Sequence, residues 1–350
     1  MTGIAGNDRV RSGPWMAAAS HCRIGGVPCG RGQIPRFGPC RDPVVIRTDC
    51  WQVAQLLVLL VLVALAGCAG FERNVVHEQT SMFGQIVVTD DGDGLRSLRF
   101  GRNGVTQSTI RVGDPDHLQF GYARLAQAGF VLACADQAAA VKCMPKRVLV
   151  VGLGGGSIPV FVHRHFPRTS IDVVEIDPAV LDVAKRFFGF SEDARMQVHV
   201  ADGRGFIERA PHAYYDVIVL DAFGSAEVPM HLATVEFLEA VRRAVAPGGV
   251  VVSNLWSRRY NRHYESMLRT YQEVFADLRV LEARQSVNHV LLASPRPITI
   301  NESQMAARAR LLSRANGFGF DLAELIADSL LATPSLLSAT PVLRDVAGRP

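Results

Sequence analysis

The sequence predicts an α/β protein with a Rossmann-like, mostly parallel sheet and a site for a nucleoside-containing ligand. Apolar, Val-rich runs alternate with helical segments across residues 147–293, the pattern of parallel strands joined by helices. The first run breaks into a glycine loop containing Gly152 and Gly154, which allows a tight turn and a close approach of the backbone to a ligand. The second run ends in Glu175, where a carboxylate can accept both hydroxyls of a ribose.

Residues 1–52 are expected to form a disordered or untranslated leader, because they are rich in Gly, Pro and Arg and show no sustained period. Residues 1–50 hold seven Arg and three Asp with no Lys or Glu, so they carry 7 − 3 = +4, the whole net charge of the chain. Residues 51–350 therefore carry 30 basic and 30 acidic side chains. A formally neutral folded part implies no basic face, and we expect no nucleic-acid partner.

An aliphatic run over residues 53–66 leads into Cys68 through the sequence Leu-Ala-Gly-Cys. The run is short for a membrane span, which needs roughly 20 residues, and fits a signal-peptide core of about 7–15. Residues 53–68 resemble the signal peptide and lipobox of bacterial lipoproteins, which predicts a cell-envelope protein anchored through lipidated Cys68. An uncleaved N-terminal anchor, with the domain on the cytoplasmic face of the inner membrane, and a buried core helix are the alternatives. Residues 69–80 are then expected to be a tether.

Residues 81–112 predict a small β-hairpin domain. Strands are expected at 85–89, 95–100 and 105–107, with the Asp- and Gly-rich turn 90–94 between the first two. A helix is expected over 116–132. This helix opens the second domain, which we place at 113–295.

The larger domain continues with strands and helices in alternation. Its third strand ends before Asp202 and Gly203, and its fourth ends before Asp221. Acids at the tips of successive strands suit an adenosine with a cationic sulfonium better than a pyrophosphate, which prefers N–H donors and cations. This is the layout of enzymes that use S-adenosylmethionine or its decarboxylated form, and it predicts an S-adenosylmethionine-dependent methyltransferase-type sheet. The remaining elements are expected at 231–245 and 262–275 (helices), at 250–255, 278–281 and 287–293 (strands, the last two an antiparallel edge pair), and in a helical C-terminal appendage at 296–350.

From residue 81 to about 295 the chain resembles the polyamine aminopropyltransferase (spermidine synthase) family. The small hairpin domain in front of a methyltransferase-like sheet is the feature that separates this family from ordinary methyltransferases. The matching motifs are Ser81-Met-Phe-Gly-Gln-Ile86, Asn103-Gly-Val-Thr-Gln107, Val148 to Ser157, Val174 to Asp177, Asp202-Gly203 and Leu220-Asp221-Ala222.

The resemblance implies roles for residues at matching positions. Gln107 is similar to a cofactor-contacting glutamine of the hairpin domain, and Glu175 to the ribose-binding acid. Asp202, followed by Gly203, is similar to the acid beside the adenine amino group. Asp221 is similar to the catalytic aspartate that faces the amine. The implied reaction moves an aminopropyl group from decarboxylated S-adenosylmethionine to a small-molecule amine acceptor, as in polyamine biosynthesis, without a metal.

Three departures from the family pattern favour a divergent branch. The loop acid that binds the aminopropyl amine falls on Gly155, and a second acid after the fourth strand falls on Gly224. The family's Tyr-x-Glu falls on Phe120 and Tyr122. Because buried ammonium groups need paired charges, this pocket is expected to be more apolar than a spermidine synthase's. Methyl transfer from intact S-adenosylmethionine and a non-catalytic nucleoside-binding lipoprotein are the alternative functions, and a homodimer stays open as the oligomeric state.

Overall fold

The computed structural model describes residues 55, 74–133, 144–223, 228–284, 286–331, 335 and 339–346. The chain divides into two units, 1–69 and 70–350, and every element below belongs to the second. The expected signal peptide and Cys68 lie outside the described residues, apart from Gln55. Within the described ranges no helix is long and apolar enough to cross a membrane.

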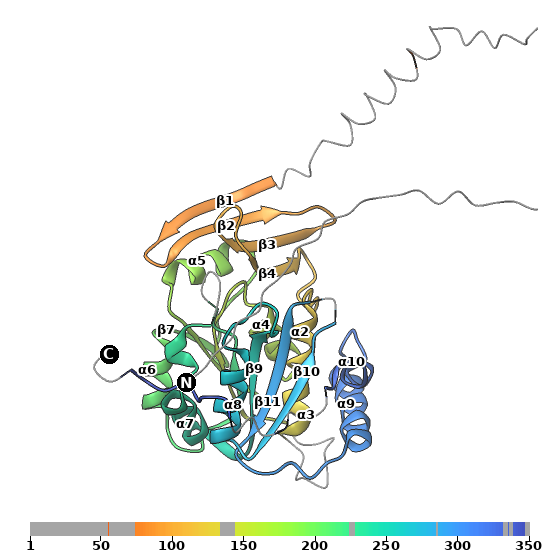
Figure 1. Cartoon of the computed structure of the whole chain (residues 1–350). Coiled ribbons are helices and arrows are strands. Elements are labelled where there is room, and N and C mark those ends of the chain that lie inside the picture. The colour runs from red at the N-terminus through yellow and green to blue at the C-terminus, as the bar shows by residue number, and fades with distance from the viewer. Residues whose placement is uncertain are drawn as a thin grey trace, which may run out of the picture. The chain divides into compact units, whose positions relative to one another are not determined.

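A small antiparallel sheet opens the second unit (Figure 1). Its strands run in the order β1 (Asn74–Ser81), β2 (Gly84–Asp90), β3 (Leu95–Phe100) and β4 (Thr106–Arg111). The expected hairpin domain is present, but the expected tether over 69–80 is wrong in its second half, because residues 74–80 form β1. This edge strand is mostly polar and half-exposed, so it lacks the apolar alternation that identifies a strand in a sequence; its backbone pairing with β2 holds it.

The helix expected over 116–132 is two short helices, α2 (Gly121–Leu125) and α3 (Ala128–Leu132). Gln127 lies between them, fully buried. Its N–H donates to the carbonyl oxygen of Arg124 at 3.2 Å, a tighter i−3 bond. Its side-chain amide instead reaches the carbonyl oxygen of Ala123 at 3.1 Å. The side chain thus replaces the helical backbone bond and divides the helix.

The large sheet has seven strands in the order β10-β11-β9-β8-β5-β6-β7. Strands β5 to β9 are parallel to one another, and β10 and β11 complete one edge in antiparallel pairing. This confirms the predicted Rossmann-like sheet and its antiparallel edge pair. The strands span Arg147–Val151 (β5), Ser170–Glu175 (β6), Met196–Val200 (β7), Tyr215–Leu220 (β8), Val245–Trp256 (β9), Asp277–Glu282 (β10) and Asn288–Ser294 (β11).

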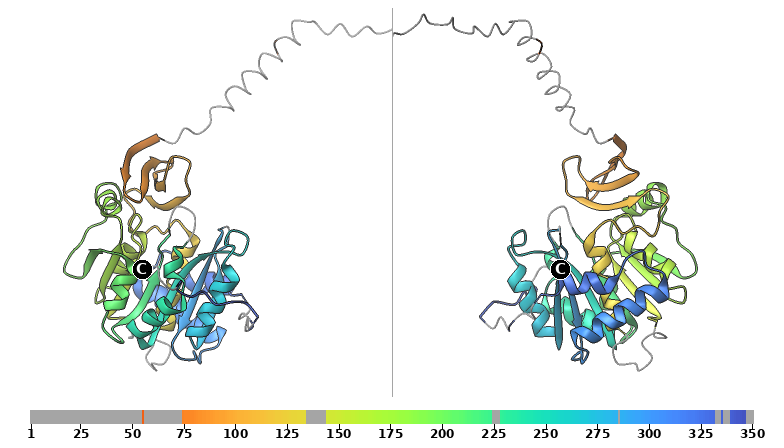
Figure 2. Two further views of the ribbon diagram at one scale, coloured as in Figure 1. Left: turned by 60° about the vertical axis from the view of Figure 1, so that its left-hand side comes forward. Right: turned by 90° about the vertical axis from the view of Figure 1, so that its right-hand side faces the viewer.

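Helices cover both faces of the large sheet, because strands such as β5 are apolar on both faces. Val148 and Val150 pack into the core cluster shared with α3, α4, α9 and α10, whereas Leu149 and Val151 pack with α7 and α8. Figure 2 shows α9 and α10 side by side, on the face of the large sheet that carries Val148 and Val150. The helices span Ser157–His165 (α4), Pro178–Phe187 (α5), Gly203–Arg209 (α6), Met230–Leu232 (η1, a 3-10 turn), Val235–Ala244 (α7), Tyr264–Val274 (α8), Glu302–Asn316 (α9) and Leu322–Ser329 (α10).

The C-terminal appendage is helical only in part. Helices α9 and α10 confirm the expectation, but the described residues 339–346 have no helix and return along α7. There the N–H of Val235 donates to the carbonyl oxygen of Leu343 at 2.8 Å. Arg204 bonds both carboxylate oxygens of Asp345, at 2.8 and 2.5 Å. Polar contacts of this kind give no periodic signal in the sequence.

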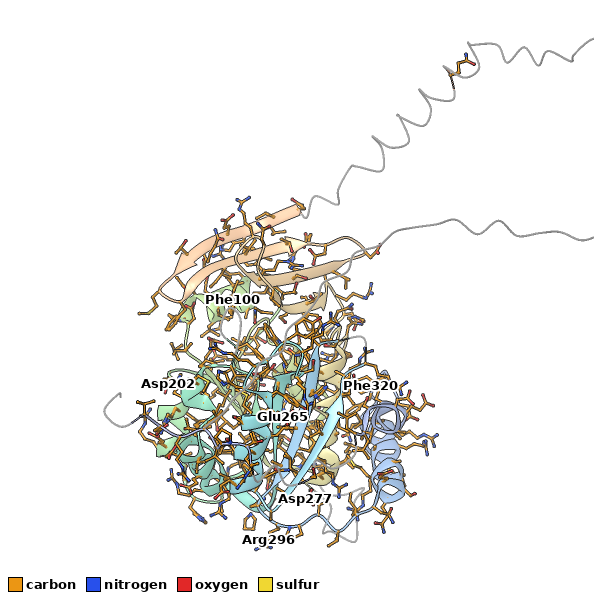
Figure 3. All side chains as sticks on the ribbon, viewed as in Figure 1. Phe100, Asp202, Glu265, Asp277, Arg296 and Phe320 are labelled. Carbon is orange, nitrogen blue, oxygen red and sulfur yellow. The ribbon has the colours of Figure 1, made fainter. Side chains whose placement is uncertain are left out.

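The small sheet docks on α5. Ile86, Val88 and Leu98 are buried against Val183 and Phe188, and the Gln79 amide donates to the carbonyl oxygen of Ala179 at 3.3 Å. The small sheet therefore faces the carboxyl ends of the parallel strands, where open α/β sheets bind ligands. In Figure 3, the labelled Asp277 and Arg296 mark the opposite, remote end of the large sheet.

Candidate active site

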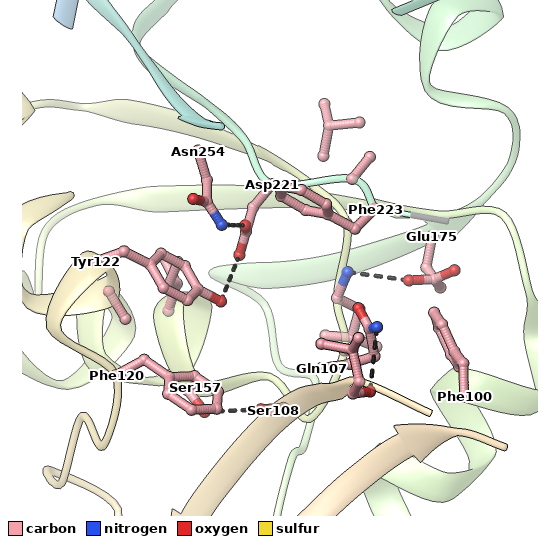
Figure 4. Close-up of a pocket in the computed structure, with 18 of the residues that line it drawn as sticks. Phe100, Gln107, Ser108, Phe120, Tyr122, Ser157, Glu175, Asp221, Phe223 and Asn254 are labelled. Carbon is pink, nitrogen blue, oxygen red and sulfur yellow. Dashed lines mark hydrogen bonds between the residues drawn. The ribbon is translucent and has the colours of Figure 1, made fainter. Parts of the chain in front are cut away.

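A cavity of about 820 Å³ opens between the small sheet and the carboxyl edge of the large one. Its lining comes from β4, from α2 and from the tips of β5, β6, β8 and β9 (Figure 4). The cavity brings together every site residue expected from the sequence: Gln107, Gly152, Gly154, Glu175, Asp202, Gly203 and Asp221.

The glycine loop is shaped by close backbone contact at Gly152. Its φ is +99°, and a Cβ there would lie 2.5 Å from the carbonyl oxygen of Asp221. Its N–H donates to the carbonyl oxygen of Val174 at 2.8 Å. Only glycine fits between the tips of β6 and β8. The loop can therefore lie close to the ends of these strands, which leaves space in the cavity for a ligand.

Glu175 ends β6 and is held from behind by backbone donors. Its carboxylate accepts the N–H of Leu153 at 3.0 Å and the N–H of Asp177 at 2.9 Å. Burial raises the pKa of Glu175, although these two bonds favour the charged form. A carboxylate oxygen accepts more than one hydrogen bond, so both oxygens remain able to accept ribose hydroxyls.

Asp202 and Gln107 lie in the cavity with partners of their own. Asp202 caps α6 by accepting the N–H of Gly205 at 2.8 Å, and its other oxygen lies 3.1 Å from Nε2 of His231. The Gln107 amide donates to the carbonyl oxygen of Val105 at 3.3 Å. Capping and ligand contact are therefore compatible at Asp202, since a cap uses one oxygen.

Asp221, at the tip of β8, is the centre of a polar network (Figure 4). One carboxylate oxygen accepts the Asn254 amide at 2.8 Å, and the other accepts the Tyr122 hydroxyl at 3.4 Å. Asn254 in turn accepts the Asn288 amide at 2.8 Å, and Asn288 accepts the Ser286 hydroxyl at 2.5 Å. Burial raises the pKa of Asp221 to about 7, against the lowering effect of its two donors. The carboxyl can therefore gain or lose a proton near neutral pH.

Aromatic side chains surround this carboxylate. Phe120 stacks on Tyr122 with ring centres 5.8 Å apart, and Phe223 stacks on Trp256 at the same distance. All four line the cavity. Aromatic faces attract cations. The part of the cavity around Asp221, called the acceptor side below, therefore suits a substrate with one amine flanked by apolar groups. Gly224, where the family pattern has a second acid, lies outside the described residues.

Gly155 cannot be changed to the family's acid without movement of its neighbours. A Cβ at this position would lie 2.7 Å from Oγ of Ser108 and 2.8 Å from Cδ1 of Phe188. Ser108 is itself held 3.2 Å from the hydroxyl of Ser157. Packing between the small sheet and α5 therefore fills the space that an acid would need.

Part of the site was not predicted from the sequence. Asn288 and Ser286 were not expected to act there, although the predicted antiparallel strand at 287–293 begins beside them. Its register pairs Asn288 with Trp256, and register could not be read from the sequence. Arg124 was also missed, although it lies four residues after Phe120 on a predicted helix and lines the cavity.

Comparisons with known proteins agree with this geometry. Residues 133–283 match the spermine/spermidine synthase domain family. A polyamine aminopropyltransferase of Vibrio vulnificus is 31% identical over 265 residues, which cover 74% of this chain and 85% of the relative. The crystal structure of a probable spermidine synthase from Corynebacterium glutamicum covers 78% of this chain and 98% of its own, with a TM-score of 0.62 and 25% identity.

Methyltransferases are also similar. The eEF1A lysine and N-terminal methyltransferase of Bos taurus is 37% identical over 205 residues, 53% of this chain. The match spans only 28% of that longer protein. The similarity therefore concerns a domain and not the relative as a whole.

Proposed function

The chain belongs to the spermine/spermidine synthase family, and from this premise we propose that it transfers a group from an adenosyl sulfonium to an amine. The single observation that carries the proposal is the cavity that joins Glu175, at the tip of β6, to Asp221, at the tip of β8. One acid suits a ribose, and the other suits a nucleophile. The aromatic lining favours an acceptor with a single amine, as do the hydrogen-bond partners that the acids of the described lining already have.

The residues present fit the adenosine part of S-adenosylmethionine. Gly152 keeps the loop low, because a side chain there would strike the backbone of Asp221. Glu175 has free acceptor capacity for ribose hydroxyls, and Asp202, with Gln107 across the cavity, is available to the base. When bound, the sulfonium supplies an electrophilic carbon: the amine nitrogen forms the C–N bond, the C–S bond breaks, and its electron pair stays on sulfur.

Asp221 accepts the proton that the amine loses. Its pKa of about 7 places it near the pH at which a general base is effective. Tyr122 and Asn254 fix its two oxygens, so the amine is oriented before it reacts. Phe120, Phe223 and Trp256 keep water from the acceptor side and leave the amine lone pair unsolvated.

Methyl transfer is the reaction that the geometry favours. An aminopropyl donor carries an ammonium group, which the family's loop acid would pair. Here Ser108 and Phe188 occupy the space at Gly155, so that ammonium would have no partner at this loop. Intact S-adenosylmethionine carries the same ammonium, but its own α-carboxylate lies next to that group and balances its charge. The methyltransferase relatives support the same choice.

Aminopropyl transfer, the reaction implied by the sequence motifs, remains the second candidate. The similarity to polyamine aminopropyltransferases covers most of the chain. The two reactions differ in the donor form that is consumed, so they are separable by experiment.

A turnover assay with Asp221→Asn tests the proposal. The full chain is incubated with amine acceptors and each donor form, and products are identified by mass spectrometry. We expect turnover to fall at least about 100-fold in the variant, the scale of losing a general base. Asp172→Asn is the matched control, because this β6 acid bonds Tyr215 and His199 outside the cavity. Equal rates in the wild type and Asp221→Asn would remove Asp221 from the mechanism.

A further inference from the structure

Arg124 lines the cavity, and its side chain has no partner among the residues that the structure describes. It lies in the last turn of α2, four residues after the N-cap Phe120, and both residues line the cavity. Its Nε atom is buried and makes no hydrogen bond. Across the described residues, no hydrogen bond or ion pair of its guanidinium is found.

An unpaired guanidinium in a partly closed cavity is costly, because a desolvated charge requires a counter-charge. A planar guanidinium fits a carboxylate particularly well, through two parallel charge-assisted bonds. The residue is therefore poised for an anionic group of a ligand.

The other charged residues that line the described cavity have partners. Arg284 lies 3.8 Å from Asp328, and His231 lies against Asp202. Glu175 and Asp221 have the donors described above, and Asp177 accepts the N–H of Ala179 at 2.9 Å and the hydroxyl of Ser81 at 2.5 Å. Among the described lining residues no carboxylate is paired with Arg124, so an anionic group of a ligand can supply its counter-charge.

The two adenosyl sulfonium forms differ in one anionic group. S-adenosylmethionine carries an α-carboxylate at the end of its aliphatic tail, and the decarboxylated form has lost it. The nucleoside, the sulfonium and the amino group are common to both. A cation such as Arg124 therefore distinguishes the two forms, because only S-adenosylmethionine has a carboxylate to pair with it and to balance the charge of the shared ammonium.

We propose that Arg124 binds the α-carboxylate of S-adenosylmethionine and so selects the intact, methyl-donating form. This proposal rests on the proposed adenosyl-sulfonium function and adds the residue that sets its donor. Two features act together. Ser108 and Phe188 fill the space at Gly155 where the family's acid would pair the donor's ammonium, and the Arg124 guanidinium supplies a partner for a carboxylate.

Calorimetric binding to the full chain tests the proposal. The probes are S-adenosylhomocysteine, which carries the carboxylate, and methylthioadenosine, which carries neither the carboxylate nor the amino group. Arg124→Met should weaken S-adenosylhomocysteine binding about 10- to 100-fold, the scale of a lost hydrogen bond to a charged group. Methylthioadenosine binding should stay within about twofold, because its contacts lie elsewhere in the cavity.

Two further variants make the test specific. Arg124→Lys keeps the positive charge but lacks the two parallel N–H donors of a guanidinium. It should therefore lose less affinity for S-adenosylhomocysteine than Arg124→Met does. Arg284→Met removes the other cavity arginine, which already has a partner, and should leave the preference for S-adenosylhomocysteine intact.

The possible outcomes distinguish the role of Arg124 from the binding of an adenosyl sulfonium, on which that role depends. If the wild type binds neither probe, the adenosyl-sulfonium function fails and the inference with it. If the wild type binds methylthioadenosine but Arg124→Met leaves S-adenosylhomocysteine binding unchanged, the inference alone is overturned. Should Arg124→Met not fold, the wild type still decides: it must prefer S-adenosylhomocysteine, and added salt must reduce that preference.

Discussion

Asp221 places an ionisable carboxylate at the wall of the cavity, where the surrounding protein removes most of its contact with water. Burial raises its pKa to about 7 from the ordinary 3.8. The Tyr122 hydroxyl and the Asn254 amide donate to it, but neither carries a charge that would return the pKa to its ordinary range. Such a group is active as a base only when it has lost its proton, and this gives the reaction a definite pH dependence.

We expect kcat/KM to fall as the pH drops through about 7, because protonated Asp221 cannot accept the proton of the amine. The acid side of the pH profile should disappear in Asp221→Asn, whose residual rate comes from positioning alone. Steady-state rates across the neutral range, with one amine acceptor, measure this. An inflection near 3.8, the ordinary value, would mean that burial does not shift this carboxyl.

The same shift predicts a change in stability. The folded state holds the Asp221 proton more tightly than the unfolded chain, so its contribution is fully favourable below 3.8 and is lost as the pH rises to about 7. Asp221→Asn removes this loss, so the variant should be more stable than the wild type by about 2–4 kcal/mol above neutral pH. The two proteins should converge in acid. Urea unfolding at several pH values tests it, and a constant difference between them would contradict it.

Single residues also show what the sequence could predict. Glu175, Asp202 and Asp221 were predicted because each follows an apolar run, and strand tips in a parallel sheet share one edge. Asn288 was missed because its position depends on the antiparallel register of β11. Arg124 was missed because only the folded structure shows whether a charged side chain has a hydrogen-bond or ion-pair partner. Sequence periodicity places an element; it does not reveal which charges remain unpaired.

At the scale of elements, the glycine loop between β5 and α4 sets the depth of the cavity. The loop can lie close to β8 only because Gly152 has no side chain. The predicted order of strands and helices was confirmed because those runs are buried and strongly apolar. β1 escaped prediction because an edge strand is held by backbone bonds that leave its side chains free to be polar.

Gly152→Ala should therefore damage both the fold and the site. Its φ of +99° is unfavourable for alanine, and the added Cβ would meet the Asp221 backbone at 2.5 Å. We expect a loss of about 3 kcal/mol or more in the free energy of unfolding, together with loss of methylthioadenosine binding. Gly248→Ala is the matched control, since nothing lies within 4 Å of a Cβ there. Comparable losses in the two variants would contradict the close-contact explanation.

At the scale of the whole molecule, the location of the protein determines its supply of donor. We propose that Cys68 is lipidated and becomes the mature N-terminus, on the strength of the short aliphatic run and the Leu-Ala-Gly-Cys sequence. Two or more acyl chains would make the anchorage stable, because one chain binds only marginally. Such a protein would face a compartment where no S-adenosylmethionine is expected.

Mass spectrometry of the membrane-extracted protein tests the lipidation directly. We expect a mature chain that begins at Cys68 and carries lipid, with the first 67 residues absent. An N-terminus upstream of Cys68 without lipid would refute lipidation and favour the cytoplasmic face of the inner membrane, where the donor is available.

Methyl transfer from the intact sulfonium can be identified by the nucleoside that the reaction releases. The full chain receives equal amounts of S-adenosylmethionine and its decarboxylated form with a mixture of amines, and Asp221→Asn serves as the blank. Methyl transfer releases S-adenosylhomocysteine, and aminopropyl transfer releases methylthioadenosine, whatever the acceptor. We predict that S-adenosylhomocysteine accumulates above the blank. Accumulation of methylthioadenosine instead would contradict the claim and establish the aminopropyl reaction.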